Sequence, residues 1–141
     1  MIRSLASIVA EIEKQTTDEA QADIMKKNSS GALKTIIGYA LDPGVTWKIP
    51  AGAPPYRPLH AAADQEGKLY SEAQRMFIYF VDSPEHRNIA QTKREQLFIQ
   101  VLESIDAEDA KLVLRVKDKA LKISRKAVKM AFPNVAKDWP E

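Results

Sequence analysis

The chain contains no cysteine, which excludes disulfide bonds, thiolate metal sites and a cysteine nucleophile. Glycine is also scarce, with five residues in a chain of 141. No apolar run reaches the length of about 18 residues that a membrane-spanning helix requires. The apolar stretch at the N-terminus is too short for a signal peptide and leads directly into acidic residues. These absences predict a cytoplasmic protein.

The residue patterns of common catalytic sites are missing as well. The sequence has no Gly-x4-Gly-Lys-Ser/Thr loop of the kind that binds nucleotide phosphates. His60 and His86 lie in different segments, and neither has further metal ligands at a suitable spacing. We therefore expect no enzymatic activity, no metal site and no cofactor. Capping and solvation account for the carboxylate pairs, which are Glu11/Glu13, Asp18/Glu19 and Glu108/Asp109.

What the chain does contain is a helical pattern over most of its length. A chain of this size favours one domain, residues 1–141, and its apolar residues recur at spacings of three and four. We expect six to seven helices around one core, which makes the fold class all-α. The first helix is indicated by an apolar stripe of Ile2, Leu5, Val9 and Ile12. The second begins at a capping box of Thr16 and Glu19 and ends near Asn28. The third has Leu33, Ile36, Ile37 and Ala40 on one side.

The second half of the chain predicts four more helices. The run MFIYFV at residues 76–81 has the composition of a buried strand, but no second strand is evident to pair with it. We therefore predict that this run forms the most buried helix. The candidate caps are Ser71 and Gln74 for this helix, Thr92 with Glu95 for the next, Asp106 for the sixth and Ser124 for the seventh.

A proline- and glycine-rich loop at residues 42–68 separates these two groups of helices. It holds five of the eight prolines, which disfavours helix, although residues 45–49 suit a short extended piece. A loop this long is functional or mobile, or it is a strap that packs Trp47 and Tyr56 onto the core. In the tail, residues 134–141, Trp139 either docks onto a partner or folds back onto its own domain.

Positive charge is concentrated near the C-terminal end. Residues 111–137 contain nine Lys or Arg and one acid, so this segment carries +8 in a chain of net charge +2, and the remainder sums to −6. Free N–H groups at the start of the seventh helix, beside Ser124, suit a phosphate. Helical spacing predicts one basic stripe of Lys111, Arg115, Lys119 and Lys122 on the sixth helix and a second basic face of Arg125, Lys126 and Lys129 on the seventh.

Three explanations fit this basic surface. A solvated helix face normally mixes both signs of charge, which this segment does not. An acidic protein partner and nucleic acid both match a surface of one sign. Because no aromatic residues alternate with the cations, the pattern favours contacts to the backbone of a DNA duplex over stacking on single-stranded bases. Lys26 and Lys27 are candidates for a second contact.

Several segments of the chain also resemble a known family. ADIMKKN at 22–28, GALKTIIGYA at 31–40 and VTWKI at 45–49 are similar to the opening of the N-terminal DNA-binding domain of ATP-dependent DNA ligases, in particular those of T-even-type bacteriophages. DAKLVLRVKDKALKISRKAVKMAFP at 109–133 is similar to the closing element of that domain, in which a Leu-basic-Ile-Gly turn lies against DNA. The resemblance implies an all-α phage protein in the infected bacterial cell that binds double-stranded DNA, nicked or intact, with little sequence preference.

Two departures from that family bear on function. Ser124 stands where the ligases have glycine, and a Cβ there holds the backbone further from a sugar-phosphate. No lysine lies in the Lys-x-Asp-Gly motif that ligases adenylate, and no oligonucleotide-binding barrel follows. The resemblance therefore implies a free-standing, non-catalytic protein that is accessory to phage DNA metabolism. The alternative is an adaptor or inhibitor that binds a phage or host protein through the basic face, the loop 42–68 and Trp139.

Overall fold

The computed structural model describes residues 4–50, 54–57, 69, 75–84, 88–137 and 139. Within these residues the chain forms six α-helices and one 3-10 helix, and the only pairing of extended segments is a single bridge between Trp47 and Val81. The prediction of an all-α fold is confirmed. The elements are α1 (Leu5–Glu13), α2 (Asp18–Lys27), α3 (Gly31–Leu41), the 3-10 helix η2 (Phe77–Phe80), α5 (Gln91–Ser104), α6 (Ala107–Lys117) and α7 (Arg125–Ala131).

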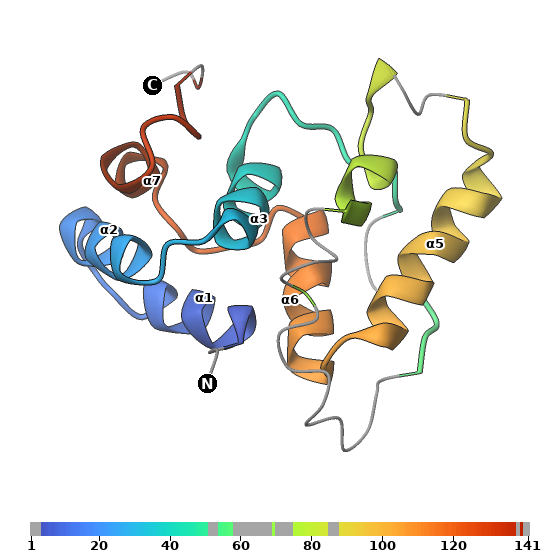
Figure 1. Ribbon diagram of the computed structural model, residues 1–141, viewed down its shortest axis with the longest axis horizontal. Helices are drawn as coiled ribbons and strands as arrows, with labels where there is room; N and C mark the ends of the chain where they lie inside the picture. The colour runs from blue at the N-terminus through green and yellow to red at the C-terminus, as the bar shows by residue number, and fades with distance from the viewer. Residues whose placement is uncertain are drawn as a thin grey trace.

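The helix α6 lies near the middle of the molecule and packs against α1, α3 and α5 (Figure 1). On the left of this view α1, α2 and α7 lie together, and α2 packs against both α1 and α7. On the right, α5 packs against η2. One core runs through both groups and includes the fully buried side chains Leu5, Ile37, Phe98 and Val113. The helix α7, near the C-terminal end, therefore packs against α2, near the N-terminal end.

Polar side chains fix where most of these helices begin. Asp106 and Ser124 cap α6 and α7 as predicted. The cap of α2 is Thr17 rather than Thr16, because this start turns Gln21, Ala22 and Met25 toward the core. The expected N-terminal stripe is confirmed for Leu5, Val9 and Ile12, which are buried on α1 together with Ile8.

The helix α5 begins without a side-chain cap, so the predicted capping box of Thr92 and Glu95 is wrong. The reason is a contact with the loop after α3. The side-chain amide of Gln91 donates to the carbonyl of Lys48 at 2.7 Å and to the carboxylate of Glu95 at 3.0 Å. With Gln91 held in this way, α5 begins directly after Ala90. The Glu95 carboxylate accepts from the Gln91 side chain instead of capping the start of the helix.

The run at 76–81 is helical from Met76 to Phe80, as predicted, but Phe77–Phe80 form the 3-10 helix η2 instead of an α-helix, and Val81 is extended. Val81 pairs with Trp47. The Lys48 N–H donates to the carbonyl of Phe80 at 2.7 Å, and the Asp82 N–H donates to the carbonyl of Thr46 at 2.8 Å. The extended piece expected at 45–49 thus pairs with the end of the run, through the bridge between Trp47 and Val81. The rings of Phe77 and Phe80 belong to an aromatic cluster that also contains buried Phe98 and the partly buried Tyr39 and Trp47.

In the described parts of the loop 42–68, Ile49 is buried in the core and Trp47 and Tyr56 pack against it. Trp47 donates its indole N–H to the carbonyl of Tyr39 at 3.0 Å, and Tyr56 is half-buried against the core. Trp139 is 6% exposed, so it folds back onto its own domain. No described helix is long and apolar enough to cross a membrane. Several residues singled out in the sequence lie outside the described residues: Ile2, His60, Ser71, Gln74 and His86.

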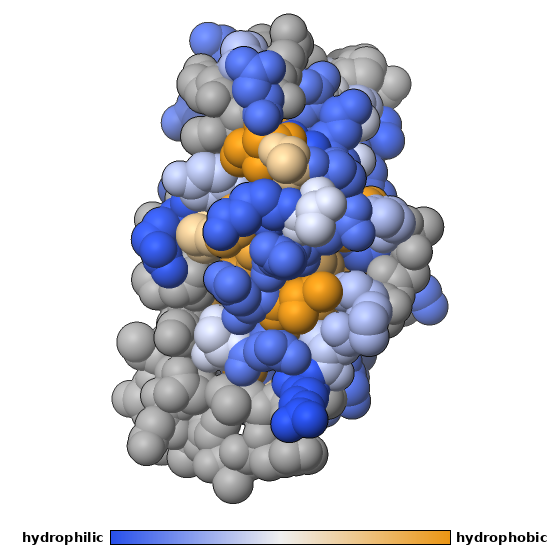
Figure 2. Space-filling view, turned by 90° about the vertical axis from the view of Figure 1, so that its right-hand side faces the viewer, coloured by the Kyte–Doolittle hydropathy of each residue, from blue (hydrophilic) through white to orange (hydrophobic). Residues whose placement is uncertain are grey.

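The side of the molecule that carries α5 is mostly hydrophilic in its coloured residues (Figure 2). The apolar spots on this face are small and separate from one another. Met130 is the one large hydrophobic residue of the described chain that is clearly exposed, and it lies on α7. On the described surface, charged side chains are therefore better candidates for a binding site than apolar ones.

Candidate nucleic-acid interface

The predicted basic stripe on the sixth helix is interrupted, because α6 ends at Lys117. Beyond this end Lys119 has a φ of 54°, in the left-handed region, and the chain is not helical again until α7 begins. Lys119 and Lys122 therefore do not continue the helical face of Lys111 and Arg115. The prediction of one continuous stripe is wrong.

Two backbone hydrogen bonds explain where α6 stops. The Lys119 N–H donates to the carbonyl of Val116 at 3.0 Å, and the Ala120 N–H donates to the carbonyl of Arg115 at 2.8 Å. This pair of bonds is the Schellman arrangement, in which the residue with positive φ is usually glycine. Here lysine occupies that position, which hid the helix end from the sequence pattern.

The two cations on the exposed part of α6 each have an acidic partner. Lys111 pairs with Glu108 at 3.3 Å on the surface. The Arg115 guanidinium pairs with the carboxylate of Glu13, whose side chain is only 11% exposed. Exposed pairs of the first kind contribute little to stability, whereas the second joins α6 to the end of α1. The positive charge of Arg115 is therefore partly neutralised by the protein itself.

Lys117 and Lys119 both reach the backbone that follows α3. Lys117 is 4% exposed and donates to the carbonyl of Pro50 at 3.0 Å. The Lys119 amine donates to the carbonyls of Asp42, at 2.8 Å, and Val45, at 2.6 Å. These two lysines connect the end of α6 to the loop after α3. Both therefore have a structural role that the sequence did not reveal.

The pKa of Lys119 also shows how the charges are arranged. Burial lowers this pKa, the negative charge of Asp42 opposes the shift, and the positive charge of Arg125 lowers the pKa further. A lysine is sensitive to another cation only when the two are close together. The side chains of Lys119 and Arg125 therefore lie close enough to repel each other.

The turn before α7 is held by the first two helices. The Lys122 N–H donates to the carboxylate of Glu13 at 2.7 Å, and the Ser124 N–H donates to the side-chain oxygen of Gln21 at 2.9 Å. The Ala127 N–H donates to the Ser124 hydroxyl at 3.4 Å. The prediction that N–H groups at this turn are free for a phosphate is therefore wrong for Ser124 and Ala127. Ser124 has a φ of −71°, so this backbone has no need of glycine.

The cations that remain for a partner lie around the start of α7. Lys122, Arg125 and Lys126 are exposed, and none of the ion pairs within the described part of the chain involves them. Lys129 is half-buried on the same helix, where it neighbours Arg125 at a spacing of four and Lys126 at a spacing of three. We refer to Lys122, Arg125, Lys126 and Lys129 as the basic cluster.

The last turn of α2, which packs against α7, holds the two further candidates. Lys26 is exposed. Lys27 pairs with Asp23 at 2.9 Å, and the hydrogen bond to Asp23 raises the pKa of Lys27. Cations in the last turn of a helix are also favourable for the helix dipole. Lys26 therefore remains the freer of the two for an outside contact.

One cation near α7 was missed by the sequence reasoning. The Lys34 amine lies 5.4 Å from the centre of the Phe132 ring, at the residue that ends α7. Phe132 follows Lys129 by three positions, so Lys34 lies close to the end of the basic cluster. The two segments are about 100 residues apart in the chain, and only the packing of α3 near α7 brings them together. No pattern along the sequence signals such a meeting.

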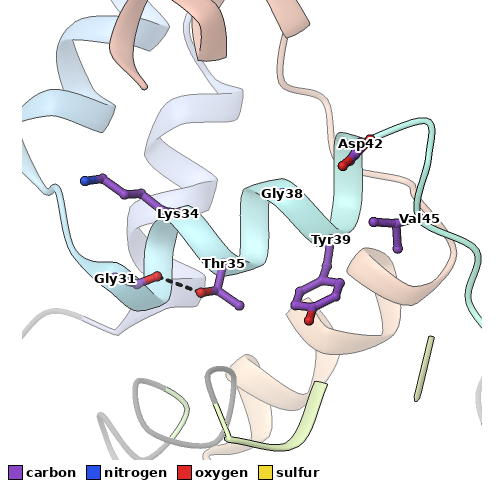
Figure 3. Close-up of a pocket in the computed structure, with 7 residues that line it drawn as sticks. All are labelled: Gly31, Lys34, Thr35, Gly38, Tyr39, Asp42 and Val45. Atoms are coloured by element: carbon purple, nitrogen blue, oxygen red, sulfur yellow. Dashed lines mark hydrogen bonds between the residues drawn. The ribbon is translucent and has the colours of Figure 1, made fainter. Parts of the chain in front are cut away.

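An open pocket of about 540 Å³ lies along α3 (Figure 3). Lys34 extends at one end of it, and Asp42 and Val45 lie at the other. The Thr35 hydroxyl donates to the carbonyl of Gly31 at 2.8 Å, so it is engaged by its own helix. Burial raises the pKa of the Tyr39 hydroxyl.

Two of the carboxylates that the sequence placed on exposed surfaces or at helix ends are buried acceptors instead. Glu13 accepts from Arg115 and from the Lys122 N–H, and Asp109 accepts from the Ala6 N–H at 2.9 Å. Both therefore join α6 and its neighbours to α1. Within the described residues, no group of three or more His, Asp or Glu side chains is placed to hold a metal ion.

The sequence profile of a family of unknown function, DUF6433, matches residues 8–123. The chain belongs to this family. No curated protein and no solved structure matches the chain. The matched residues of this DUF6433 member include α2, α3, α5 and α6 and stop at Ile123, directly before the cap of α7. The helix that carries most of the basic cluster thus lies beyond the matched residues.

Proposed function

We propose that the protein is a non-catalytic module that binds double-stranded DNA, largely without sequence preference, and that it serves phage DNA metabolism. The observation that carries this proposal is the basic cluster. Lys122, Arg125 and Lys126 are exposed, and no ion pair in the described part of the chain neutralises them. Exposed cations without internal partners are what a DNA backbone requires, because each neutralised phosphate releases bound counterions.

The placement of the other cations supports a compact contact. Lys129 continues the cluster along α7, Lys34 lies at the end of that helix, and Lys26 lies on the helix beside it. Lys111, Arg115, Lys117 and Lys119 have partners within the protein, so we assign the contact to α7 and its neighbours rather than to α6. This surface is smaller than the whole basic segment of the sequence.

A resemblance to the DNA-binding domain of ATP-dependent DNA ligases gives further support to this proposal. The similarity includes residues 109–133, in which the turn before α7 and the cluster lie. In that family the corresponding turn lies against duplex DNA. Since Ser124 has an ordinary extended backbone, its side chain does not strain the turn.

The second candidate is an adaptor or inhibitor that binds an acidic phage or host protein. Its expected contact surfaces beyond the cluster were the loop 42–68 and Trp139. The described aromatic residues of these parts, Trp47, Tyr56 and Trp139, pack against the core. Apart from Met130, which is exposed on α7, the described large apolar side chains are thus already used inside the fold. Because a protein interface usually needs apolar anchors, this favours DNA as the partner.

Fluorescence anisotropy with labelled intact duplex, nicked duplex and single strand tests the proposal at about 50 and 200 mM salt. The test variant is Lys122/Arg125/Lys126→Ala. The matched control is Lys48/Arg57/Lys93→Ala, which removes three exposed cations elsewhere and includes two from the loop 42–68. Both variants change the net charge equally, so a difference between them reports the location of the contact.

We expect the wild type to bind duplex DNA with an affinity that falls steeply with salt. The cluster variant should bind more weakly, and each lost phosphate contact should reduce the slope of log K against log salt by about 0.9. The control should keep nearly the wild-type slope. Absence of duplex binding at low salt, or an equal loss in both variants, would refute the proposal. In the first case capture of a protein partner becomes the next experiment.

A further inference from the structure

The turn of Lys122, Ile123 and Ser124 connects the basic cluster to the rest of the fold. Side chains from α1 and α2 hold its polar backbone atoms. Gln21 donates its amide N–H to the Lys122 carbonyl at 3.1 Å, and its side-chain oxygen accepts from the Ser124 N–H at 2.9 Å. Glu13 accepts from the Lys122 N–H at 2.7 Å. Residues more than 100 positions apart in sequence thus fix this turn.

The chemistry of this position requires an amide. Gln21 is 6% exposed, and its NH₂ group also donates to the carbonyl of Ile12 at 3.3 Å. A carboxylate has no donor for the two carbonyls, and an apolar side chain has neither donor nor acceptor. Only a side chain with both functions satisfies all three backbone groups, which belong to the end of α1 and to the turn.

The cations of the cluster follow from the turn directly. Lys122 is within it, and Arg125 and Lys126 are the first two residues of α7 after the cap. Ile123 is buried and provides an apolar anchor, but an apolar contact alone is not directional. The hydrogen bonds of Gln21 are directional, so they fix the orientation of the turn and therefore the angle at which α7 packs on α2.

We propose that Gln21 is a positioning residue for the basic cluster. Its amide holds the turn 122–124 so that Lys122, Arg125 and Lys126 keep one arrangement before DNA is bound. Groups that are ordered in advance do not lose that freedom on binding, which strengthens the affinity. This inference rests on the proposed function, and it assigns a role in that function to a buried side chain which does not touch DNA.

The test variant is Gln21→Met, which keeps a long unbranched side chain and removes all three hydrogen bonds. The control is Val101→Ala, which opens a cavity beside α5, a helix that packs against α6 and η2. Both proteins are studied at a temperature at which they are fully folded. The measurements are the dissociation constant for duplex DNA by anisotropy and the amide hydrogen exchange of Lys122 and Ser124.

We expect Gln21→Met to bind duplex DNA about three- to tenfold more weakly than the wild type. The Ser124 amide should exchange faster in this variant, and Val101→Ala should bind as the wild type does. If Gln21→Met fails to fold, Gln21→Asn replaces it with the same expected results, because its amide is one methylene too short to reach all three partners.

The outcomes separate the inference from the proposed function. Wild-type affinity in Gln21→Met, with faster exchange at Ser124, would overturn the inference and leave DNA binding intact. An equal loss of affinity in Val101→Ala would also overturn it, because the effect would then follow stability alone. If the wild type itself binds no duplex DNA, the proposed function fails, and the inference fails with it.

Discussion

Replacing Lys119 by alanine and by glycine tests how this residue stabilises the junction between α6 and α7. Lys119 combines a left-handed backbone, with a φ of 54°, and an amine that bridges the carbonyls of Asp42 and Val45. Both substitutions remove the amine. Only glycine also removes the backbone strain, so the difference between the two variants isolates the conformational part.

The magnitudes follow from these two contributions. The amine is only partly buried, so its hydrogen bonds should contribute about 1 kcal/mol in total. A residue other than glycine costs about 1–2 kcal/mol in the left-handed region, and glycine adds about 0.4–1 kcal/mol of entropy to the unfolded chain. Lys119→Ala should therefore lose about 1 kcal/mol, and Lys119→Gly should be about 0.5–1 kcal/mol more stable than Lys119→Ala.

Urea denaturation of the wild type and both variants measures these differences, with thermal melting as a second probe. A difference of 1 kcal/mol corresponds to about 2–4 °C in melting temperature for a domain near this size. Because the Lys119 amine is engaged within the protein, Lys119→Gly should also reduce DNA affinity less than Lys122→Ala does. An alanine variant as stable as the glycine variant would refute the assignment of a left-handed backbone to Lys119.

Three further predictions follow from buried groups. Glu13→Ala leaves Arg115 and the turn before α7 without their acceptor and should cost about 2–4 kcal/mol in urea denaturation; a loss below 0.5 kcal/mol or so would contradict the contact. Burial raises the pKa of Tyr39, so the unfolded chain ionises first and stability should fall as pH rises above about 10; Tyr39→Phe should flatten that fall in denaturation curves across this range, and an unchanged curve would contradict the burial. Trp139→Ala should cost about 3–5 kcal/mol, whereas a tail that docks onto a partner would lose almost no stability in the isolated protein.

The sequence predicted those parts of the fold that depend on neighbours along the chain. The caps at Asp106 and Ser124 and the apolar faces of α1 and α3 are local features, and the structure contains them. The start of α5 was misplaced, because the anchor of Gln91 on Lys48 is a contact between distant segments. The pairing of Trp47 with Val81 was hidden for the same reason.

The candidate site also depends on contacts between distant segments, which the sequence did not predict. Helical spacing placed Lys111, Arg115, Lys119 and Lys122 on one face, but a left-handed lysine ends α6 where glycine is normal. Whether a cation is available to a partner depends on the acids and carbonyls that tertiary folding brings to it. Glu13 meets Arg115, and Asp42 meets Lys119, only in the folded chain. The basic character of the segment was visible in the sequence, and the identity of its unpaired cations was not.

The contacts of α7 with α2, and of the turn before α7 with Glu13 of α1, have a consequence for how the protein is made. During synthesis α1 and α2 leave the ribosome about 100 residues before the turn that Glu13 and Gln21 hold. Until that turn arrives, the core-facing side of α2 lacks its partner helix, and contacts between such distant segments form slowly. Nascent chains should therefore remain dependent on protection from aggregation until the turn 122–124 and α7 have been synthesised. A fragment interrupted before residue 122 would lack the basic cluster and would also leave the side of α2 that packs against α7 uncovered.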